Sequence, residues 1–172
     1  GASWDATDTL VPSIESAIRN IMLGQNYYRK EFGVESTDIF LPDCFGFGWT
    51  LPAIASHCGL IGFSSQKLQW RNKPFYGNDK YPFTVGLWQG IDGSTIMMTH
   101  GYDYNQRFED GDLSENKDLL ELTGHSPLHM VYRYYGTGDI GGSPTLESVR
   151  AVEKGLQGNG PLQIVSATSD RI

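Results

Sequence analysis

The sequence predicts an α/β fold built on a mainly parallel sheet, and three observations lead to this prediction. Short apolar runs alternate with helical patterns along the chain, which is the order of strand–helix–strand crossovers. One Asp-Gly pair between two β-rich runs adds a hairpin. Two of the apolar runs end at glycine-containing loops that carry an aspartate. Folds of this kind do their chemistry in the loops at the carboxyl ends of parallel strands, so these two loops are the first candidates for a site.

The composition fits one folded domain and excludes some partners. The chain has 172 residues, of which 39% are hydrophobic and 19% are charged, and this length is enough for a sizeable core. Its net charge is −7, without a cluster of Lys and Arg, which indicates no nucleic-acid partner. No apolar stretch approaches the roughly 18–20 residues that span a bilayer, so no membrane span is expected. Cys44 and Cys58 are expected to be free thiols, and the compartment stays open.

The first third of the chain predicts helix, strand, helix and strand. Apolar and aromatic residues at alternating spacings of four and three predict a helix from residue 12 to about residue 32, and Gly33 suits its end. The apolar run at 39–41 reads as a buried strand. The next two elements are a helix at 50–58 and a second buried strand at 60–64.

The rest of the chain predicts a hairpin, two more strands and two helical segments. Asp92-Gly93 joins two β-rich runs, and Ser143 can cap a helix that has Pro144 in its first turn. The hairpin strands are placed at 84–89 and 95–100. The remaining predictions are loops at 71–81 and 101–112, a short helical segment at 113–122, and strands at 128–135 and 162–167.

Two aspartates lie just beyond predicted strands. Asp43 follows the strand at 39–41 after Pro42 has ended the pairing, and Asp139 follows the strand at 128–135. Because loops after parallel strands open on one side of a sheet, the two carboxylates could converge. Paired carboxylates that flank one bond are the machinery of glycoside hydrolysis. The plain alternative is that each acid caps a helix or closes a turn.

Aromatic residues in the predicted loops would suit the apolar faces of sugar rings. These residues are Trp4, Trp49, Trp70 and Tyr104.

A set of motifs adds a family resemblance. The segment Leu41–Gly46 reads Leu-Pro-Asp-Cys-Phe-Gly and resembles the Pro-Asp-x-Phe-Gly motif of the family 38 glycoside hydrolases, the class II, zinc-dependent α-mannosidases. Five further matches keep the family's order: Trp4 and Asp8 with the helix ending in Glu31–Val34, then Gln66–Trp70, Trp88–Ser94, Thr99–His100 and Gly138–Thr145. Each motif is short, but six motifs in the same order as in the family make the resemblance specific.

The resemblance implies roles for individual residues. Asp43 matches the family's nucleophile, which forms the glycosyl-enzyme and is also a zinc ligand, and Asp139 lies in the loop that matches the acid/base residue. Lys67 and Tyr104 fall in segments that line the sugar site, and Trp4 is a further substrate-binding candidate. The expected cofactor is zinc, and the expected partner is a mannose-containing oligosaccharide or glycan. A retaining pair of carboxyls would lie roughly 5–5.5 Å apart.

The chain also departs from the family pattern. Gly48 stands where many relatives have Ser, Ile140 and Ser143 replace two loop glycines, and Ala6 stands where relatives often have Glu. The family's zinc site needs an upstream His-x-Asp pair and a distant downstream histidine, and this sequence contains neither. The resemblance therefore implies that residues 1–172 are a single partial catalytic domain. This piece would cover some strands of a seven-stranded β/α barrel with one β-hairpin insertion.

The expected function is retaining hydrolysis of α-mannosidic bonds through a covalent intermediate on Asp43, as part of a longer enzyme. The piece by itself is expected to be inactive and to self-associate through exposed sheet edges. Two alternatives stay open. A deacetylase- or amidase-like metal enzyme on a related barrel would also need the missing histidines. A non-catalytic carbohydrate-binding or scaffold domain would use both acids as caps.

Overall fold

The computed structural model describes residues 1–69, 84–101 and 104–171. These residues form two compact units, which are described one at a time. The first unit contains Gly1–Leu68, Gly86–His100 and Thr168–Ile172, and the second contains Gln69–Val85 and Gly101–Ala167. The predicted loop at 71–81, Trp70 and Tyr102 lie outside the described residues. Within the described ranges, no helix is both long enough and apolar enough to cross a membrane.

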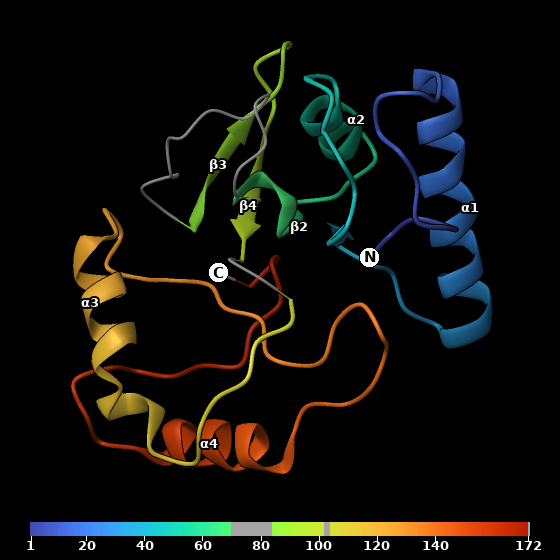
Figure 1. Cartoon of the computed structure of the whole chain (residues 1–172). Helices are drawn as coiled ribbons and strands as arrows, with labels where there is room; N and C mark the ends of the chain where they lie inside the picture. Colours follow the sequence, from blue (N-terminus) through green and yellow to red (C-terminus); the bar gives the residue numbers. More distant parts are fainter. Residues whose placement is uncertain (70–83, 102–103, 172) are drawn as a thin grey trace. The chain divides into compact units, whose positions relative to one another are not determined.

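A four-stranded sheet forms the centre of the first unit, in the order β1-β2-β4-β3 (Figure 1). The strands are β1 (Asp38–Phe40), β2 (Gly62–Ser65), β3 (Val85–Gln89) and β4 (Thr95–His100). β1 pairs with β2 in parallel, and β2 pairs with β4 in parallel. β3 and β4 run in opposite directions on either side of the Asp-Gly turn. Both the parallel pairing of the first two strands and the hairpin, as predicted from sequence, are confirmed.

Helix α1 (Ile14–Phe32) begins one residue after Ser13, whose hydroxyl accepts a hydrogen bond from the Ser16 amide at 3.2 Å. It ends at Gly33, which has a φ of 68° and closes the helix in the left-handed region. The predicted end is therefore right, and Pro12 lies outside the helix. In the middle of the predicted apolar face Ile21 is buried, but Ile14 and Phe32 at its two ends are 54% and 63% exposed.

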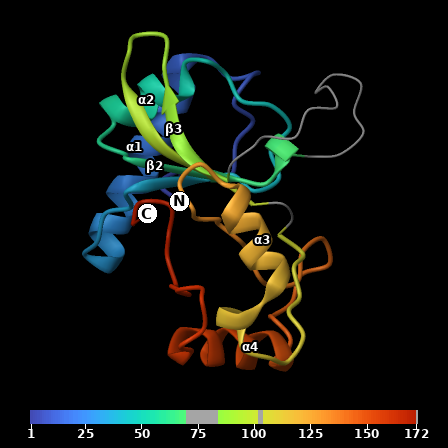
Figure 2. The same cartoon turned by 90° about the vertical axis from the view of Figure 1, so that its left-hand side faces the viewer.

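Helix α2 (Leu51–His57) packs with α1, and Figure 2 shows both helices behind the strands of the sheet. The strands and α2 bury apolar side chains that make up the core of this unit. The largest of them is Phe63 on β2, whose ring meets the rings of Phe47 and Trp88 edge-on at centroid distances of 5.0 Å each. Other core residues are Ile39, Leu41, Leu51, Ile54, Leu60 and Ile96. This core fixes the end of β1, from which the Asp43 loop emerges.

The second unit is helical and irregular. It contains the short 3-10 helix η2 (Leu113–Glu115), α3 (Lys117–His125) and α4 (Leu146–Gln157). Its core is a cluster of Leu113, Leu119, Ala151 and Leu162. Thr145 caps α4, because its hydroxyl accepts the Ser148 amide at 3.2 Å. The predicted cap at Ser143 is therefore wrong by two residues: a threonine hydroxyl closer to the first free amides takes its place.

The strands predicted at 128–135 and 162–167 are absent from the structure, which has irregular backbone at both places. The backbone groups of these runs bond to loops instead of to a neighbouring strand. The Tyr132 amide donates to the Thr84 hydroxyl at 2.7 Å, and the Leu162 amide donates to the Ser114 carbonyl at 3.1 Å. His129 has a φ of 50°, which interrupts any extended run. Apolar and aromatic composition alone predicted these strands, and it does not supply a pairing partner.

Candidate active site

The Asp43 loop leaves the sheet at the carboxyl end of β1. The Leu41 amide still pairs with the Ser64 carbonyl at 3.0 Å, and Leu41 is buried, so the chain is held up to the residue before Pro42. Asp43 follows with its side chain 56% exposed. The acid does not cap the next helix, because the residue at the N-cap of α2 is Thr50. The capping half of the plain alternative is therefore wrong for Asp43, and the acid lies in a turn at residues 42–43.

The N-terminal segment holds this loop in place. The Thr9 hydroxyl donates to the Gly46 carbonyl at 2.8 Å, and the Cys44 thiol donates to the Thr7 carbonyl at 3.1 Å. Gly46 has a φ of 115°, and a side chain there would also come within 2.6 Å of Leu10. The backbone conformation is what favours glycine at this place, since the Leu10 atom that a side chain would meet is the tip of a flexible side chain.

Asp43 forms an ion pair with Lys67. The Lys67 Nζ atom lies 2.5 Å from Asp43 Oδ1, and the Lys67 side chain is only 8% exposed. Lys67 begins the short 3-10 helix η1 (Lys67–Gln69), two residues after the end of β2. Because β1 and β2 are adjacent and parallel, their carboxyl ends bring the acid and the base together. The ammonium also lies over the Phe45 ring, 4.6 Å from its centroid.

Two ionisable side chains close to Asp43, those of Cys44 and Asp8, take part in hydrogen bonds that hold the local backbone. Burial raises the pKa of the Cys44 thiol, and the nearby carboxylates of Asp8 and Asp43 raise it further. Cys44 thus stays a protonated donor rather than a nucleophilic thiolate. The Asp8 carboxylate accepts hydrogen bonds from the Leu10 and Val11 amides at 2.7 and 3.0 Å, and these bonds lower the pKa of Asp8.

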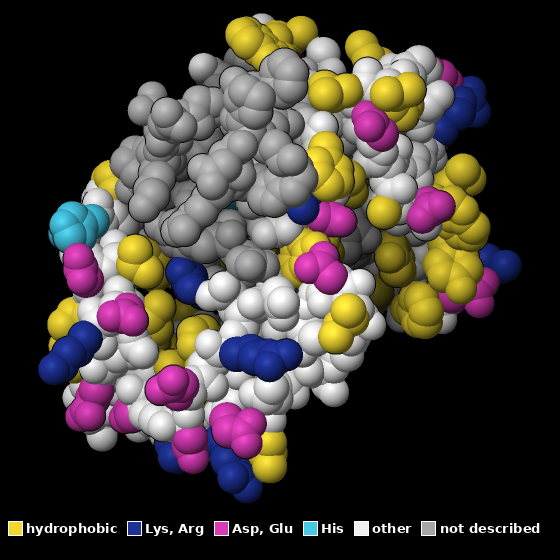
Figure 3. All heavy atoms as spheres, viewed as in Figure 1, with side chains coloured by type: hydrophobic (Ala, Val, Ile, Leu, Met, Phe, Trp, Pro, Cys, Tyr) yellow, Lys and Arg dark blue, Asp and Glu magenta, His cyan; other side chains and the backbone are white. Residues whose placement is uncertain are grey.

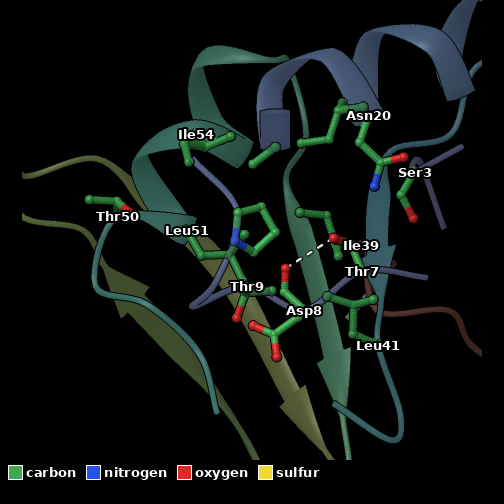
Figure 4. Close-up of a pocket in the computed structure, with 13 residues that line it drawn as sticks. Ser3, Thr7, Asp8, Thr9, Asn20, Ile39, Leu41, Thr50, Leu51 and Ile54 are labelled. Atoms are coloured by element: carbon green, nitrogen blue, oxygen red, sulfur yellow. Dashed lines mark hydrogen bonds between the residues drawn. The ribbon is translucent and has the colours of Figure 1, made fainter. Parts of the chain in front are cut away.

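A small pocket lies between the N-terminal segment, α1, β1 and α2 (Figure 4). Its walls come from Thr7, Asp8 and Thr9 on one part of the chain and from apolar side chains such as Ile39, Leu51 and Ile54 on the others. Asp43 and Lys67 are not among its lining residues. The pocket is therefore a small cavity in the packing beneath the Asp43 loop, and it is not a substrate site for Asp43.

Asp139 belongs to the second unit and is held by Tyr104. The Tyr104 hydroxyl donates to Asp139 Oδ1 at 2.5 Å, and the Gly138 amide donates to the Asn105 side-chain oxygen at 3.4 Å. Asp139 is exposed and has a φ of 60°, in the left-handed region that aspartate tolerates better than most residues. A Cβ atom on Gly138 would lie 2.0 Å from the Tyr104 ring, so the ring requires glycine there. Since Thr145 caps α4, Asp139 is not a cap either.

The structure thus pairs four of the five site residues predicted from sequence, Asp43 with Lys67 and Tyr104 with Asp139. Because these pairs lie in different units, the expected convergence of Asp43 and Asp139 stays a prediction. The fifth residue, Trp4, lies against α1: its ring meets Tyr27 edge-on at 5.2 Å and is 58% exposed. Its role in substrate binding also stays a prediction.

Sequence reasoning missed two features of the first unit. One is the Phe45 ring under the Lys67 ammonium, for which the aromatic residue two positions after the acid was the available signal. The other is His100, which is fully buried at the carboxyl end of β4, in register with Ser65. A histidine that ends a predicted strand is the signal that could have drawn attention to it.

The described residues do not fit a complete zinc site. Nowhere within residues 1–69, 84–101 and 104–171 do three or more His, Cys, Asp or Glu side chains gather closely enough to hold a metal ion. The group that lies against Asp43 Oδ1 is an ammonium, which cannot ligate a cation. Asp43 could supply one ligand, and further ligands would have to come from elsewhere.

Fold and site together define an α/β protein that carries carboxylates in loops, one of them at the carboxyl end of a parallel strand, a class that includes glycoside hydrolases. Residues 1–170 match the model described as the glycosyl hydrolases family 38 N-terminal domain, and the chain belongs to this family. The family resemblance carried by the sequence motifs is confirmed.

Relatives of the chain are named as α-mannosidases. Alpha-mannosidase G of Dictyostelium discoideum is 37% identical over 156 residues, covering 87% of this chain and 13% of that protein. An alpha-mannosidase of Saccharomyces cerevisiae is 32% identical over 156 residues, covering 90% of this chain and 14% of the yeast protein. The chain therefore spans a small part of these relatives' length, and their names support a glycosidase as the parent protein.

A solved structure supports the fold. The crystal structure of an alpha-mannosidase from Enterococcus faecalis V583 matches with a TM-score of 0.56 and 16% identity, covering 91% of this chain and 18% of that one. At this identity the likeness concerns the fold alone. The α/β class predicted from the sequence is confirmed at this level.

Proposed function

We propose that the chain is part of the catalytic domain of a retaining α-mannosidase in which Asp43 is the nucleophile. The observation that carries the proposal is the position of Asp43, a half-exposed carboxylate at the carboxyl end of a parallel strand, fixed by a buried ammonium 2.5 Å away. Membership of family 38 supplies the reaction class. In the intact protein, the four-stranded sheet would be part of a seven-stranded β/α barrel completed by segments outside this chain.

In this mechanism Asp43 attacks the anomeric carbon of the mannoside and forms a covalent glycosyl-enzyme as the bond to the leaving oxygen breaks. Asp139 donates its proton to that leaving oxygen. It then takes a proton from the water that attacks the intermediate, which releases mannose with retained configuration and restores Asp43. In a retaining mechanism of this kind, the carboxyl groups of Asp43 and Asp139 would lie roughly 5–5.5 Å apart in the intact enzyme.

The Tyr104 contact supports Asp139 as the acid/base residue. A phenol hydroxyl can donate to a carboxylate and can accept from a carboxylic acid, so it can stay hydrogen-bonded to Asp139 in both protonation states. An acid/base residue passes through both states in each turnover.

The proposed substrate is a mannose-containing oligosaccharide or glycan. Lys67, Tyr104 and Trp4 are the proposed substrate-binding residues, and the exposed Trp4 ring offers an apolar face to a sugar. The proposed cofactor of the intact protein is zinc, with Asp43 as one ligand and the others supplied by segments outside this chain.

The experiment that tests the nucleophile uses the full-length parent enzyme. We expect Asp43→Ala to lower kcat by at least about 10³-fold, because it removes the group that forms the intermediate. Asp110→Ala is the matched control, since Asp110 is an exposed aspartate paired with Lys154 at 2.6 Å on the second unit. A fluorinated mannosyl inactivator should label Asp43, as seen by mass spectrometry of the digested protein. Turnover within tenfold of wild type in Asp43→Ala, or a label on another carboxylate, would contradict the assignment.

A further inference from the structure

We propose that Lys67 is a positioning residue for Asp43, which fixes the orientation of the nucleophilic carboxylate before a sugar binds. This role rests on the proposed function and deepens it. The main role of Lys67 would be to orient Asp43, and not to contact the sugar directly. The inference is based on the 2.5 Å contact between Lys67 Nζ and Asp43 Oδ1.

The two partners differ in how they are held. The Lys67 side chain is 8% exposed, whereas the Asp43 side chain is 56% exposed. The protein therefore surrounds the cation and leaves the carboxylate facing the solvent side. A side chain this buried presents little surface to a substrate, so a sugar would meet the carboxylate before it could meet the ammonium. Burying an ammonium is costly unless an anion lies against it, and Asp43 meets this need.

Lys67 is fixed at both its ends. At the backbone, the Lys67 amide donates to the hydroxyl of Ser65, which is fully buried at the end of β2, at 3.2 Å. At the tip, the ammonium lies 4.6 Å from the centroid of the Phe45 ring, within the range of a cation–π contact. Phe45 comes from the same loop as Asp43. The loop thus supplies both an anion and an aromatic face to one buried cation, and a long flexible side chain is confined to one conformation.

The chemical consequence concerns the direction of attack. A carboxylate on an exposed loop rotates about its terminal torsion, which has broad minima. The ion pair at 2.5 Å between the Lys67 ammonium and Oδ1 restricts that rotation. Covalent catalysis requires the attacking oxygen to be aligned with the anomeric carbon, and a misplacement of about 1 Å can cost about 10²-fold in rate.

Positioning and sugar binding predict different kinetics. A residue that contacts the sugar equally in the ground state and the transition state raises KM when it is removed, with little effect on kcat. A residue that orients the nucleophile lowers kcat and leaves sugar affinity almost unchanged. The affinity probe is D-mannose used as a competitive inhibitor, because it is uncharged and does not respond to the lost charge itself.

The test uses Lys67→Met, Lys67→Arg and the control Lys154→Met in the full-length enzyme. Lys154 pairs with Asp110 at a similar distance, 2.6 Å, but its side chain is 54% exposed. We expect Lys67→Met to lower kcat about 100-fold with the inhibition constant of D-mannose within threefold of wild type. Lys67→Arg keeps the charge and should stay within about tenfold of wild type in kcat, while Lys154→Met should match wild type.

Two outcomes would overturn the inference. One is a tenfold or greater rise in KM and in the D-mannose inhibition constant with kcat within threefold, which would make Lys67 a sugar contact. The other is Lys67→Met kinetics equal to those of Lys154→Met. Where Lys67→Met does not fold, as judged by circular dichroism, Phe45→Leu decides. Loss of the ring contact should lower kcat several-fold at constant D-mannose affinity, and an unchanged kcat would overturn the role.

The failure of this inference is distinguishable from failure of the proposed function. If Asp43→Ala keeps turnover, then the nucleophile assignment itself fails. If Asp43→Ala loses turnover while Lys67→Met, or Phe45→Leu where Lys67→Met does not fold, keeps the wild-type kcat, only the positioning role fails.

Discussion

Asp43 and Asp139 are held by partners of different chemistry. Asp43 has a buried ammonium at Oδ1, and Asp139 has a phenol hydroxyl at Oδ1. An ammonium donates to a carboxylate but accepts nothing, whereas a phenol can either donate or accept. The first partner suits a group that works as an anion, and the second suits a group that gains and loses a proton. The environments of the two acids thus agree with the roles that we propose for them.

A prediction at this scale concerns the Tyr104 hydroxyl. In the full-length enzyme, Tyr104→Phe removes the hydrogen bond to Asp139 and keeps the ring that packs on Gly138. We expect kcat/KM, which reports formation of the glycosyl-enzyme, to fall about tenfold on a natural mannoside, whose poor leaving group needs protonation. On an aryl mannoside with an acidic phenol as leaving group, we expect little change in kcat/KM.

Tyr135→Phe is the matched control for this experiment. Tyr135 lies in the same unit, is 42% exposed and packs its ring near Phe108, and the variant makes the same chemical change on a tyrosine that packs on Phe108. Steady-state kinetics on the two substrates give the measurement. Equal losses of kcat/KM on both substrates would contradict a role for Tyr104 through the protonation of the leaving group by Asp139.

At the scale of elements, the sequence predicted those helices and strands whose formation depends on neighbouring residues in the chain. The helix α1 was predictable because its apolar spacing and Gly33 are both read from a short window of the chain. The runs at 128–135 and 162–167 were misread because a strand exists only when a second strand pairs with it. In the structure the Tyr132 amide bonds to Thr84 and the Leu162 amide bonds to Ser114, and both partners are distant in sequence.

The candidate site likewise has parts that follow from local sequence and parts that depend on distant residues. Asp43 was predictable as a candidate because it follows an apolar run and Pro42, both local features. Its pairing with Lys67, 24 positions along the chain, follows only once β1 and β2 are known to be neighbours. The burial of the ammonium and its position over Phe45 depend on packing that no spacing rule supplies.

A prediction for α1 concerns Gly24. A Cβ atom there would lie 2.2 Å from the Ala2 carbonyl and 2.7 Å from the Trp4 amide, which are backbone atoms that cannot turn aside. We expect Gly24→Ala to displace the N-terminal segment and to lower the free energy of unfolding by about 1–3 kcal/mol. The same segment holds the Asp43 loop through Thr7 and Thr9, so catalytic activity of the intact enzyme should fall as well.

Gly124→Ala is the control, because Gly124 lies in α3 and a Cβ atom there meets nothing within 4 Å. This substitution should leave the free energy of unfolding unchanged or raise it by up to about 1 kcal/mol, since alanine favours a helix. Thermal unfolding followed by circular dichroism compares the two variants. A Gly24→Ala protein as stable as Gly124→Ala would contradict the close packing of the N-terminal segment on α1.

A prediction for the hairpin between β3 and β4 concerns pH. Hydrogen bonds from the Ser94 side chain and amide, and then from His57 at 2.9 Å, lower the pKa of Asp92 from 3.8 to about 2. A depressed pKa means that the ionised form stabilises the folded state. This contribution is complete above the unfolded value near 3.8 and is lost as the pH falls through about 2.

Asp92→Asn should therefore unfold at a lower temperature than wild type at about pH 6, and the difference should close as the pH approaches about 2. His57→Gln should show a smaller effect in the same direction, because Ser94 is the larger cause of the shift. Thermal unfolding at stepped pH measures both variants. A difference between Asp92→Asn and wild type that stays constant from about pH 6 to about pH 2 would contradict the prediction.

At the scale of the whole molecule, much apolar surface faces solvent. Figure 3 shows hydrophobic side chains gathered along the right-hand edge, over α1. The exposed apolar residues of α1 are Ile14, Met22, Leu23, Tyr27 and Phe32. The chain also spans only 13% to 14% of the length of its curated relatives. The predicted self-association of these residues on their own has a physical basis in such surfaces.

The last prediction concerns these 172 residues expressed by themselves. We expect them to bind no stoichiometric zinc and to cleave no aryl α-mannoside. A zinc site in a protein uses three or four protein ligands, and within the described residues no group of three His, Cys, Asp or Glu side chains comes together. Asp43 could contribute one ligand, and the ammonium of Lys67 against it would repel a cation that no other ligand holds.

Elemental analysis after dialysis against micromolar zinc gives the metal content, and light scattering at two protein concentrations gives the oligomeric state. The full-length parent enzyme, handled in the same way, is the positive control for both zinc and turnover. One zinc ion per chain in the 172-residue protein, or cleavage of the aryl mannoside by it, would mean that the ligands expected from other segments are not needed. Either result would overturn the proposal that Asp43 is one ligand of a zinc site completed outside this chain.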